Sequence, residues 1–350
     1  MVKSKLLAST IIVAAAAAVA AAPASAAKLK LGGYYEAWVG MGADGNKDHV
    51  NEFDVKHDSE INFDWKQKLK NGLTVGGRME MEAGTGGAAT GANTFDETSM
   101  YVKGSFGKIQ LGNNDPAAAY VGSVKGVGPV GIVKSDAGDW VGMSGAETID
   151  NDNDVGMGDN QNITYFTPKM GNISAIVSYM PDASGGTDSD YDDSETSGDR
   201  DGISAMVKYA GKAGGAKYSF AMGYSQVDTG SVTEDGWNMG VTMSSGAYTF
   251  AAFSAEEDTG SGAKNTDAGA SVKYQMNKST AVSLQYGVAV NEATNGNDDE
   301  TTIVTAGYSK KLGGGVSLEG SIFNADIDND SDSSQNISEM GIVGGFKVKF

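Results

Sequence analysis

The sequence predicts an all-β protein, a transmembrane antiparallel up-and-down β-barrel of about sixteen strands. Three observations predict this fold. Apolar and polar residues alternate with period two along most of the chain, which is typical of strands with one apolar and one polar face. Tight turns alternate with long acidic loops, and the chain stops on an aromatic residue inside an alternating segment.

The N-terminus has the features of an export signal. A lysine-containing stretch precedes an apolar run at residues 6–22, and Ala24-Ser25-Ala26 supplies a small-residue cleavage site. We therefore expect residues 1–26 to be a cleaved signal peptide and residues 27–350 to form a single barrel domain. A membrane anchor is the alternative, but the short run and the cleavage site argue against it.

Alternation marks the strands. Between residues 279 and 290, for example, Leu284 and Tyr286 alternate with Ser283 and Gln285. Most segments have ten to fourteen residues, about what a tilted strand needs to cross a bilayer. The sixteen predicted strands lie near 28–41, 53–67, 73–83, 97–106, 107–112, 160–168, 171–180, 201–210, 216–227, 235–244, 247–256, 265–276, 279–290, 300–310, 314–326 and 338–350.

The connections fall into two classes. Tight ones contain Asn, Gly or Pro, which suit short hairpin turns. Long acidic ones lie at 42–52, 84–96, 113–159, 181–200, 228–234, 257–264, 291–299 and 327–337. Strict sorting by length is typical of barrels with short turns at one membrane face and long loops at the other.

After residue 26 the sequence has no apolar stretch of about 20 residues, the length that a membrane-spanning helix needs. Every backbone amide in lipid needs a protein partner, so a closed sheet is the remaining structure that could cross the membrane. The last segment fits a closing strand. Phe346, Val348 and Phe350 point one way, whereas Lys347 and Lys349 point the other. Aromatic residues near strand ends, among them Tyr35, Trp65, Tyr101, Tyr179, Tyr209, Tyr274 and Tyr308, are candidates for interfacial girdles.

Composition narrows the possible functions. The formal net charge of −19 argues against nucleic-acid binding, which requires Lys and Arg against phosphate. The chain has no cysteine, so neither disulfides nor thiolate metal sites are available. No cofactor is expected.

With its leader, its strand cadence, its Lys347-Val348-Lys349-Phe350 ending and its long third loop at 113–159, the mature chain resembles a Gram-negative general porin, of the alpha-proteobacterial type. The resemblance implies an outer-membrane homotrimer of water-filled barrels in contact with lipid and lipopolysaccharide. It also implies that the third loop folds into each pore and that the barrel-insertion machinery recognises Phe350. The implied function is passive, non-enzymatic diffusion of small hydrophilic solutes and ions.

In such porins, acidic residues of the third loop face basic residues on the wall. Arg78, Glu80 and Lys103 have the polar parity of their strands, which predicts that they line the pore. The loop candidates are Asp136, Asp139 and Glu147, and the apolar content of this loop favours a packed insert. Because arginine is sparse and acid abundant, we expect cation preference.

Other functions stay open at this stage. A solute-specific porin and a plugged structural barrel or adhesin share the same pattern. A barrel phospholipase would need a nucleophile and a base, for which Ser144, His49 and His57 are the candidates. The acidic runs 150–154 and 326–332 have carboxylates at alternate positions, but they lack the Gly and Glu of an EF-hand. Only loose Ca²⁺ binding is therefore considered there.

Overall fold

In this computed structural model, the described residues are 27–42, 53–82, 95–122, 124–133, 136–141, 148–151, 155–158, 160–181, 201–229, 232–292, 297–330 and 336–350. They form one closed antiparallel barrel of sixteen strands, in which each strand pairs with its neighbours in the sequence and the last pairs with the first. The predicted signal peptide, residues 1–26, lies outside the described residues.

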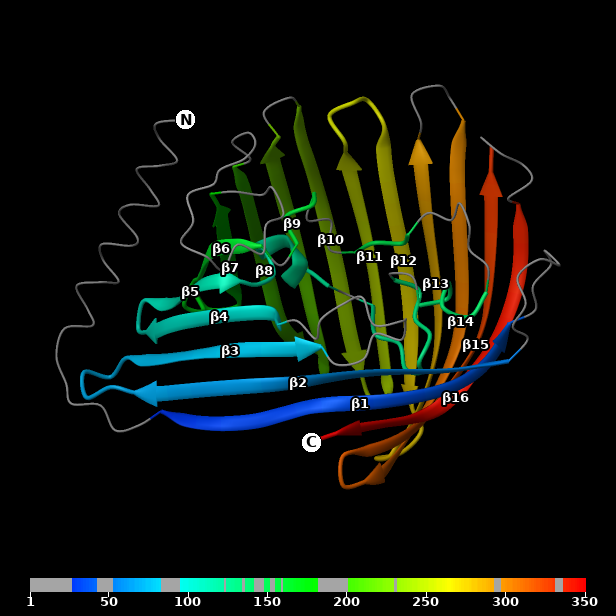
Figure 1. Ribbon diagram of the computed structural model, residues 1–350, viewed down its shortest axis with the longest axis horizontal. Coiled ribbons are helices and arrows are strands. Elements are labelled where there is room, and N and C mark those ends of the chain that lie inside the picture. Colours follow the sequence, from blue (N-terminus) through cyan, green and yellow to red (C-terminus); the bar gives the residue numbers. More distant parts are fainter. Residues whose placement is uncertain are drawn as a thin grey trace.

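The strands are β1 Lys28–Gly42, β2 Asp54–Lys68, β3 Thr74–Glu82, β4 Phe95–Gly104, β5 Gly107–Asn113, β6 Gln161–Phe166, β7 Ile173–Met180, β8 Gly202–Ala213, β9 Ala216–Asp228, β10 Thr233–Ser245, β11 Tyr248–Asp258, β12 Lys264–Gln275, β13 Thr280–Glu292, β14 Asp298–Gly313, β15 Val316–Asn329 and β16 Ile337–Lys349. Figure 1 shows their order around the barrel. Strand number, pairing and turn positions agree with the sequence prediction, and boundaries differ by a few residues.

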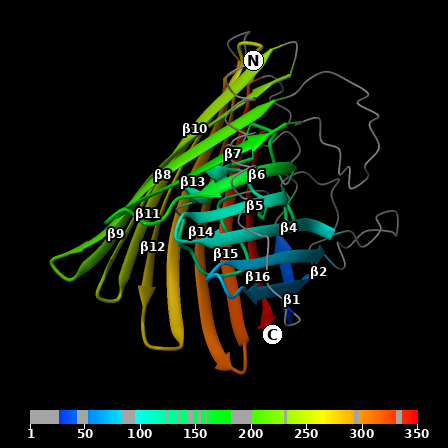
Figure 2. The same cartoon turned by 90° about the vertical axis from the view of Figure 1, so that its left-hand side faces the viewer.

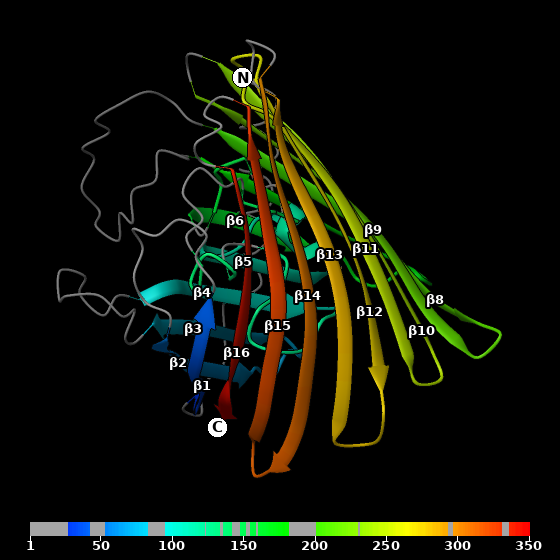
Figure 3. The same cartoon turned by 90° about the vertical axis from the view of Figure 1, so that its right-hand side faces the viewer.

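The wall is not uniform in height. β5, β6 and β7 have 7, 6 and 8 residues, whereas β14 has 16. Figures 2 and 3 show the long strands β8–β15 along one side and the short strands on the other. The barrel therefore has a short wall and a long wall.

Alternation sorts the side chains as expected, with apolar residues outside. On β13, the outward Leu284 is 53% exposed and Tyr286 49%, whereas the inward Gln285 is 3% exposed. A large apolar belt exposed around a closed sheet fits lipid as the surrounding medium. Within the described residues, no helix is long and apolar enough to cross a membrane.

The seam between β1 and β16 closes the barrel. Phe350 and Gly33 exchange two backbone hydrogen bonds, each 3.1 Å long, and the register continues from Tyr34 opposite Lys349 to Gly42 opposite Gly341. The Phe350 side chain points outward and is 64% exposed. The backbone of Phe350 thus takes part in the pairing of β1 with β16.

One predicted aromatic position is wrong. Tyr101 does not belong to an outer girdle, because it faces the lumen opposite Gly76, where a Cβ atom would lie 2.6 Å from its ring. It has the same parity as Lys103, two residues further on. The outward aromatics Tyr35, Tyr209, Tyr274 and Tyr308 are all well exposed.

Candidate functional site

The described residues of the third loop, which connects β5 to β6, lie inside the barrel. Backbone N–H groups of the loop donate to serine hydroxyls of the inner wall on four strands. These bonds run from Ala118 to Ser204 on β8 (2.8 Å), from Lys125 to Ser271 on β12 (3.1 Å), from Val127 to Ser283 on β13 (2.9 Å) and from Val130 to Ser321 on β15 (3.1 Å). Figure 1 shows the loop trace crossing the interior in front of the more distant strands β10–β14.

The predicted apolar character of the loop is explained by packing. Val130, Ile132 and Ile149 are fully buried, in one cluster with the wall residues Phe253 and Phe323. Full burial of side chains of this size contributes about 1.5–3 kcal/mol each. Hydrogen bonds and apolar contacts together fix the loop against the long wall.

Two other parts of the loop contact the wall further around the barrel. A short 3₁₀ helix, η1 (Ala117–Tyr120), lies against β7–β9, and the ring of Tyr120 meets that of Phe166 edge to face at 5.4 Å. Near the middle of the loop sequence, Trp140 covers Gly40 of β1, and the Lys56 ammonium lies 5.6 Å from its ring centroid. The described loop thus follows the wall from β6 to β1.

The wall makes room for the loop with small residues. A Cβ atom on Gly307 would collide with the carbonyl oxygen of Val127 and lie 2.9 Å from the Ser283 hydroxyl. On Gly40 it would lie 2.6 Å from the Trp140 ring. These positions require glycine because the loop backbone and a bulky ring approach the sheet closely.

On β2 and β3 most inward residues are charged. We call Asp58, Glu60, Asp64, Glu80 and Glu82 the acidic wall; all face the lumen at adjacent register positions. The described loop reaches the end of β2 through Trp140, whose ring centroid lies 5.6 Å from the ammonium of Lys56.

The guanidinium of Arg78 lies within the acidic wall. It contacts Asp64 at 3.0 Å and Glu80 at 3.1 Å, so two carboxylates of its own wall already balance its charge. The sequence prediction identified Arg78 and Glu80 but missed Asp64, which stands directly opposite Arg78 in the β2–β3 register. The tight turn between these strands fixes that register, so the hairpin pattern is the signal that locates Asp64.

The other predicted site residues have different placements. Asp136 accepts a hydrogen bond from the backbone N–H of Gly131 at 3.0 Å, within the loop itself. Asp139 is exposed on the loop, and Glu147 lies outside the described residues. Lys103 faces the lumen but lies next to a tight turn, opposite Lys108 and away from the loop contacts.

The lumen has a second charged zone at the tight-turn end. Inward-facing lysines there, which we call the lysine collar, come from both walls. On β1–β5 they are Lys28, Lys30, Lys66, Lys68, Lys103 and Lys108. On β8–β16 they are Lys208, Lys212, Lys217, Lys273, Lys311, Lys347 and Lys349.

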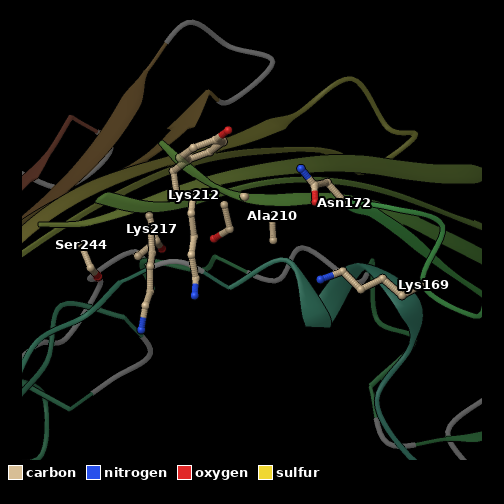
Figure 4. Close-up of a pocket in the computed structure, with 10 residues that line it drawn as sticks. Lys169, Asn172, Ala210, Lys212, Lys217 and Ser244 are labelled. Atoms are coloured by element: carbon tan, nitrogen blue, oxygen red, sulfur yellow. The ribbon is translucent and has the colours of Figure 1, made fainter. Parts of the chain in front are cut away.

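Figure 4 shows part of the collar. Lys212 and Lys217 extend from adjacent strands on the same face of the sheet, towards the third loop. They line a recess of about 570 Å³ that also includes Lys169 and Ser244. The lumen therefore has carboxylates along β2 and β3 and ammonium groups near the turns.

The described residues do not bring together the candidates for a phospholipase site or for Ca²⁺ binding. His57 points outward and its ring stacks with Tyr35 at 6.1 Å, while His49 and Ser144 lie outside the described residues. Among the described residues, no group of three or more His, Asp or Glu could hold a metal ion. Residues 152–154 and 331–332 of the acidic runs are not among them.

Comparison with known proteins identifies the family to which this barrel belongs. The Gram-negative porin family matches residues 8–331. The chain belongs to this family. The porin is 24% identical over 304 residues to outer membrane porin protein 32 of Delftia acidovorans, covering 82% of this chain and 79% of that protein.

Two solved structures show the same fold. The anion-selective porin from Comamonas acidovorans superposes with a TM-score of 0.65 at 17% identity, covering 93% of this chain and 100% of the other. The trimer form of OmpT from Vibrio cholerae gives 0.63 at 12% identity, covering 93% and 100%. This porin is thus a non-enzymatic channel for solute diffusion across the outer membrane.

Proposed function

We propose that this porin is a general diffusion channel for small hydrophilic solutes and ions, with a preference for cations at its narrowest level. The acidic wall is the observation that carries this proposal. Between Lys56 and Lys66, the described inner face of β2 and β3 has five carboxylates and a single cation, Arg78. Fixed charges lining a pore favour ions of opposite sign.

The third loop adds to this preference. Its exposed Asp139 brings a further negative charge to the lumen, and Arg78 is matched by Asp64 and Glu80. The field at this level then has the sign of the carboxylates. That arrangement differs from a basic wall facing an acidic loop, which the resemblance to general porins implies.

A structural relative is titled anion-selective, so the sign of the preference needs a direct test. We would reconstitute the porin in planar bilayers and measure the reversal potential across a KCl gradient. Cation preference with a conductance that small solutes do not block supports the proposal. Anion preference would refute its selectivity, saturable block by one solute would favour a solute-specific porin, and no conductance would favour a plugged barrel.

We also propose a homotrimer whose long walls face lipid and lipopolysaccharide. Strands β5, β6 and β7 have 7, 6 and 8 residues, fewer than the roughly 9–11 that a strand needs to cross a bilayer. A short wall facing other subunits would not have to span lipid. Cross-linking in detergent tests this, and a monomer with full conductance would contradict it.

Phe350 is proposed as the signal for the barrel-insertion machinery, because its side chain is exposed at the seam and its backbone completes the pairing of β1. Deletion of Phe350 should lower the folded outer-membrane fraction and leave the conductance of inserted channels unchanged. Phe350→Tyr, which keeps an aromatic ring, is the control. Normal insertion of the deletion variant would contradict this role.

A further inference from the structure

Few lysines of the collar form ion pairs. Of its members, only Lys347 takes part in an ion pair within the described residues, with Glu36 at 2.5 Å. Like charges gathered in one confined space repel each other, and this repulsion opposes folding. An arrangement of this kind favours binding of a mobile anion.

The third loop brings one more lysine to the collar. The backbone N–H of Lys125 is held by Ser271, two residues before Lys273 on β12. The Lys273 ammonium lies within electrostatic range of both Lys125 and Lys311. Lys125 from the loop, Lys273 from β12 and Lys311 from β14 therefore add positive charge to one region of the lumen, and none of the three takes part in an ion pair among the described residues.

A recess beside this point can hold a ligand. It has a volume of about 590 Å³ and is bounded by loop residues 126–128 and by β14–β16, with Lys311, Lys347 and Lys349 in its lining. Its one lining carboxylate, Glu319, accepts hydrogen bonds from Ser309 (3.2 Å) and Ser317 (2.8 Å). Glu36 forms an ion pair with Lys347, which leaves Lys311 and Lys349 against the single carboxylate of Glu319. The recess therefore has a surplus of positive charge.

We propose that this recess binds multiply charged oxyanions of the phosphate class, which enter from the periplasmic end and are held by Lys311 and Lys349 of its lining, with Lys125 and Lys273 adding positive charge beside it. Lysine ammonium groups bind phosphate as point charges through charge-assisted hydrogen bonds. The acidic wall repels such an anion, so it lodges in the recess and obstructs the current. The proposal deepens the proposed diffusion function and rests on it.

Block of single-channel current by pyrophosphate tests the site. In KCl of constant ionic strength, pyrophosphate on the periplasmic side should reduce the current at concentrations roughly tenfold or more below those needed on the outer side. The double variant Lys273→Gln/Lys311→Gln should weaken periplasmic block by at least roughly tenfold. Lys310→Gln is the matched control, because Lys310 neighbours Lys311 but has the outward parity.

Equal block from the two sides, or equal block of the double variant and the unchanged porin, would overturn the proposal. Lys273→Arg/Lys311→Arg keeps the charges and should retain the block, which separates charge from folding. Failure of the diffusion proposal is distinguishable, since it would appear as absent conductance in KCl alone. In that case pyrophosphate should still raise the unfolding temperature of the unchanged porin more than that of the double variant, and equal shifts would overturn the site.

Discussion

The two parts of the inner wall differ in what they present to the lumen. Under the third loop, β8–β15 offer serines and glycines, among them Ser204, Ser283, Gly307 and Ser321, which accept hydrogen bonds from the loop or leave space for it. On β2 and β3, the same inward parity holds the acidic wall and Arg78. Strand geometry is common to both parts, so the inward residues alone decide which part holds a loop and which meets water.

This difference shows that the inward residues of a period-two pattern should be divided into charged and small ones. A charged inward residue needs water or a partner, because burial of an unpaired charge is very costly. Small inward residues allow a second chain segment to approach. The wall that holds the loop and the wall that faces the solute therefore differ in the size and charge of the polar-parity residues.

The largest effect is expected from filling the space beneath the loop. Gly307→Val should displace residues near Val127, raise the single-channel conductance and lower stability by about 1–3 kcal/mol, as overpacking does. Gly320→Val on the neighbouring strand is the control, because a Cβ there meets nothing closer than 3.4 Å. Unchanged conductance of Gly307→Val would mean that the loop position does not limit the pore.

Removal of charge from the acidic wall should have the next largest effect. A unit charge about 4 Å from an ion in water is worth about 1 kcal/mol, so Glu60→Gln/Glu82→Gln should lower the K⁺/Cl⁻ permeability ratio by up to about fivefold. Reversal potentials measure this ratio. Glu256→Gln, which faces outward on β11, should leave it unchanged, and an equal drop in that control would argue against a local field.

Arg78→Ala should act in the opposite direction and more weakly. The loss of its guanidinium frees Asp64 and Glu80, so the K⁺/Cl⁻ permeability ratio should rise by about twofold. Arg78→Lys keeps the charge and is the control. If reversal potentials are the same in all three proteins, ions pass without sensing this part of the wall.

The smallest expected effect belongs to the loop. Asp139→Asn removes one exposed carboxylate, and the permeability ratio should fall by less than for the acidic-wall double variant, since water and salt screen an exposed charge. Asp136→Asn is a useful comparison because Asp136 accepts a hydrogen bond from Gly131 within the loop. A larger effect of Asp139 than of the wall would reverse the ranking of the two regions.

Local rules predict much of this fold. Alternation and turn residues are enough for the strand number, for the outward Leu284 and Tyr286 and for the inward Arg78. The error at Tyr101 comes from using residue type instead of parity. The prediction places Tyr101 outside because it is aromatic, whereas its spacing of two residues from the inward Lys103 places it inside. The course of the third loop lies beyond local reasoning, because Val127 and Val130 find partners on Ser283 and Ser321, far along the chain.

The mutual bonds of Gly33 and Phe350 have a consequence for biogenesis. The first strand obtains its second partner only when β16 and Phe350 have been made, more than 300 residues after β1, so β1 is an unpaired edge until then. In hydrocarbon each unpaired edge group costs several kcal/mol, which forbids stable insertion hairpin by hairpin. Stable membrane insertion therefore requires closure of the β1–β16 seam, so insertion and closure are coupled.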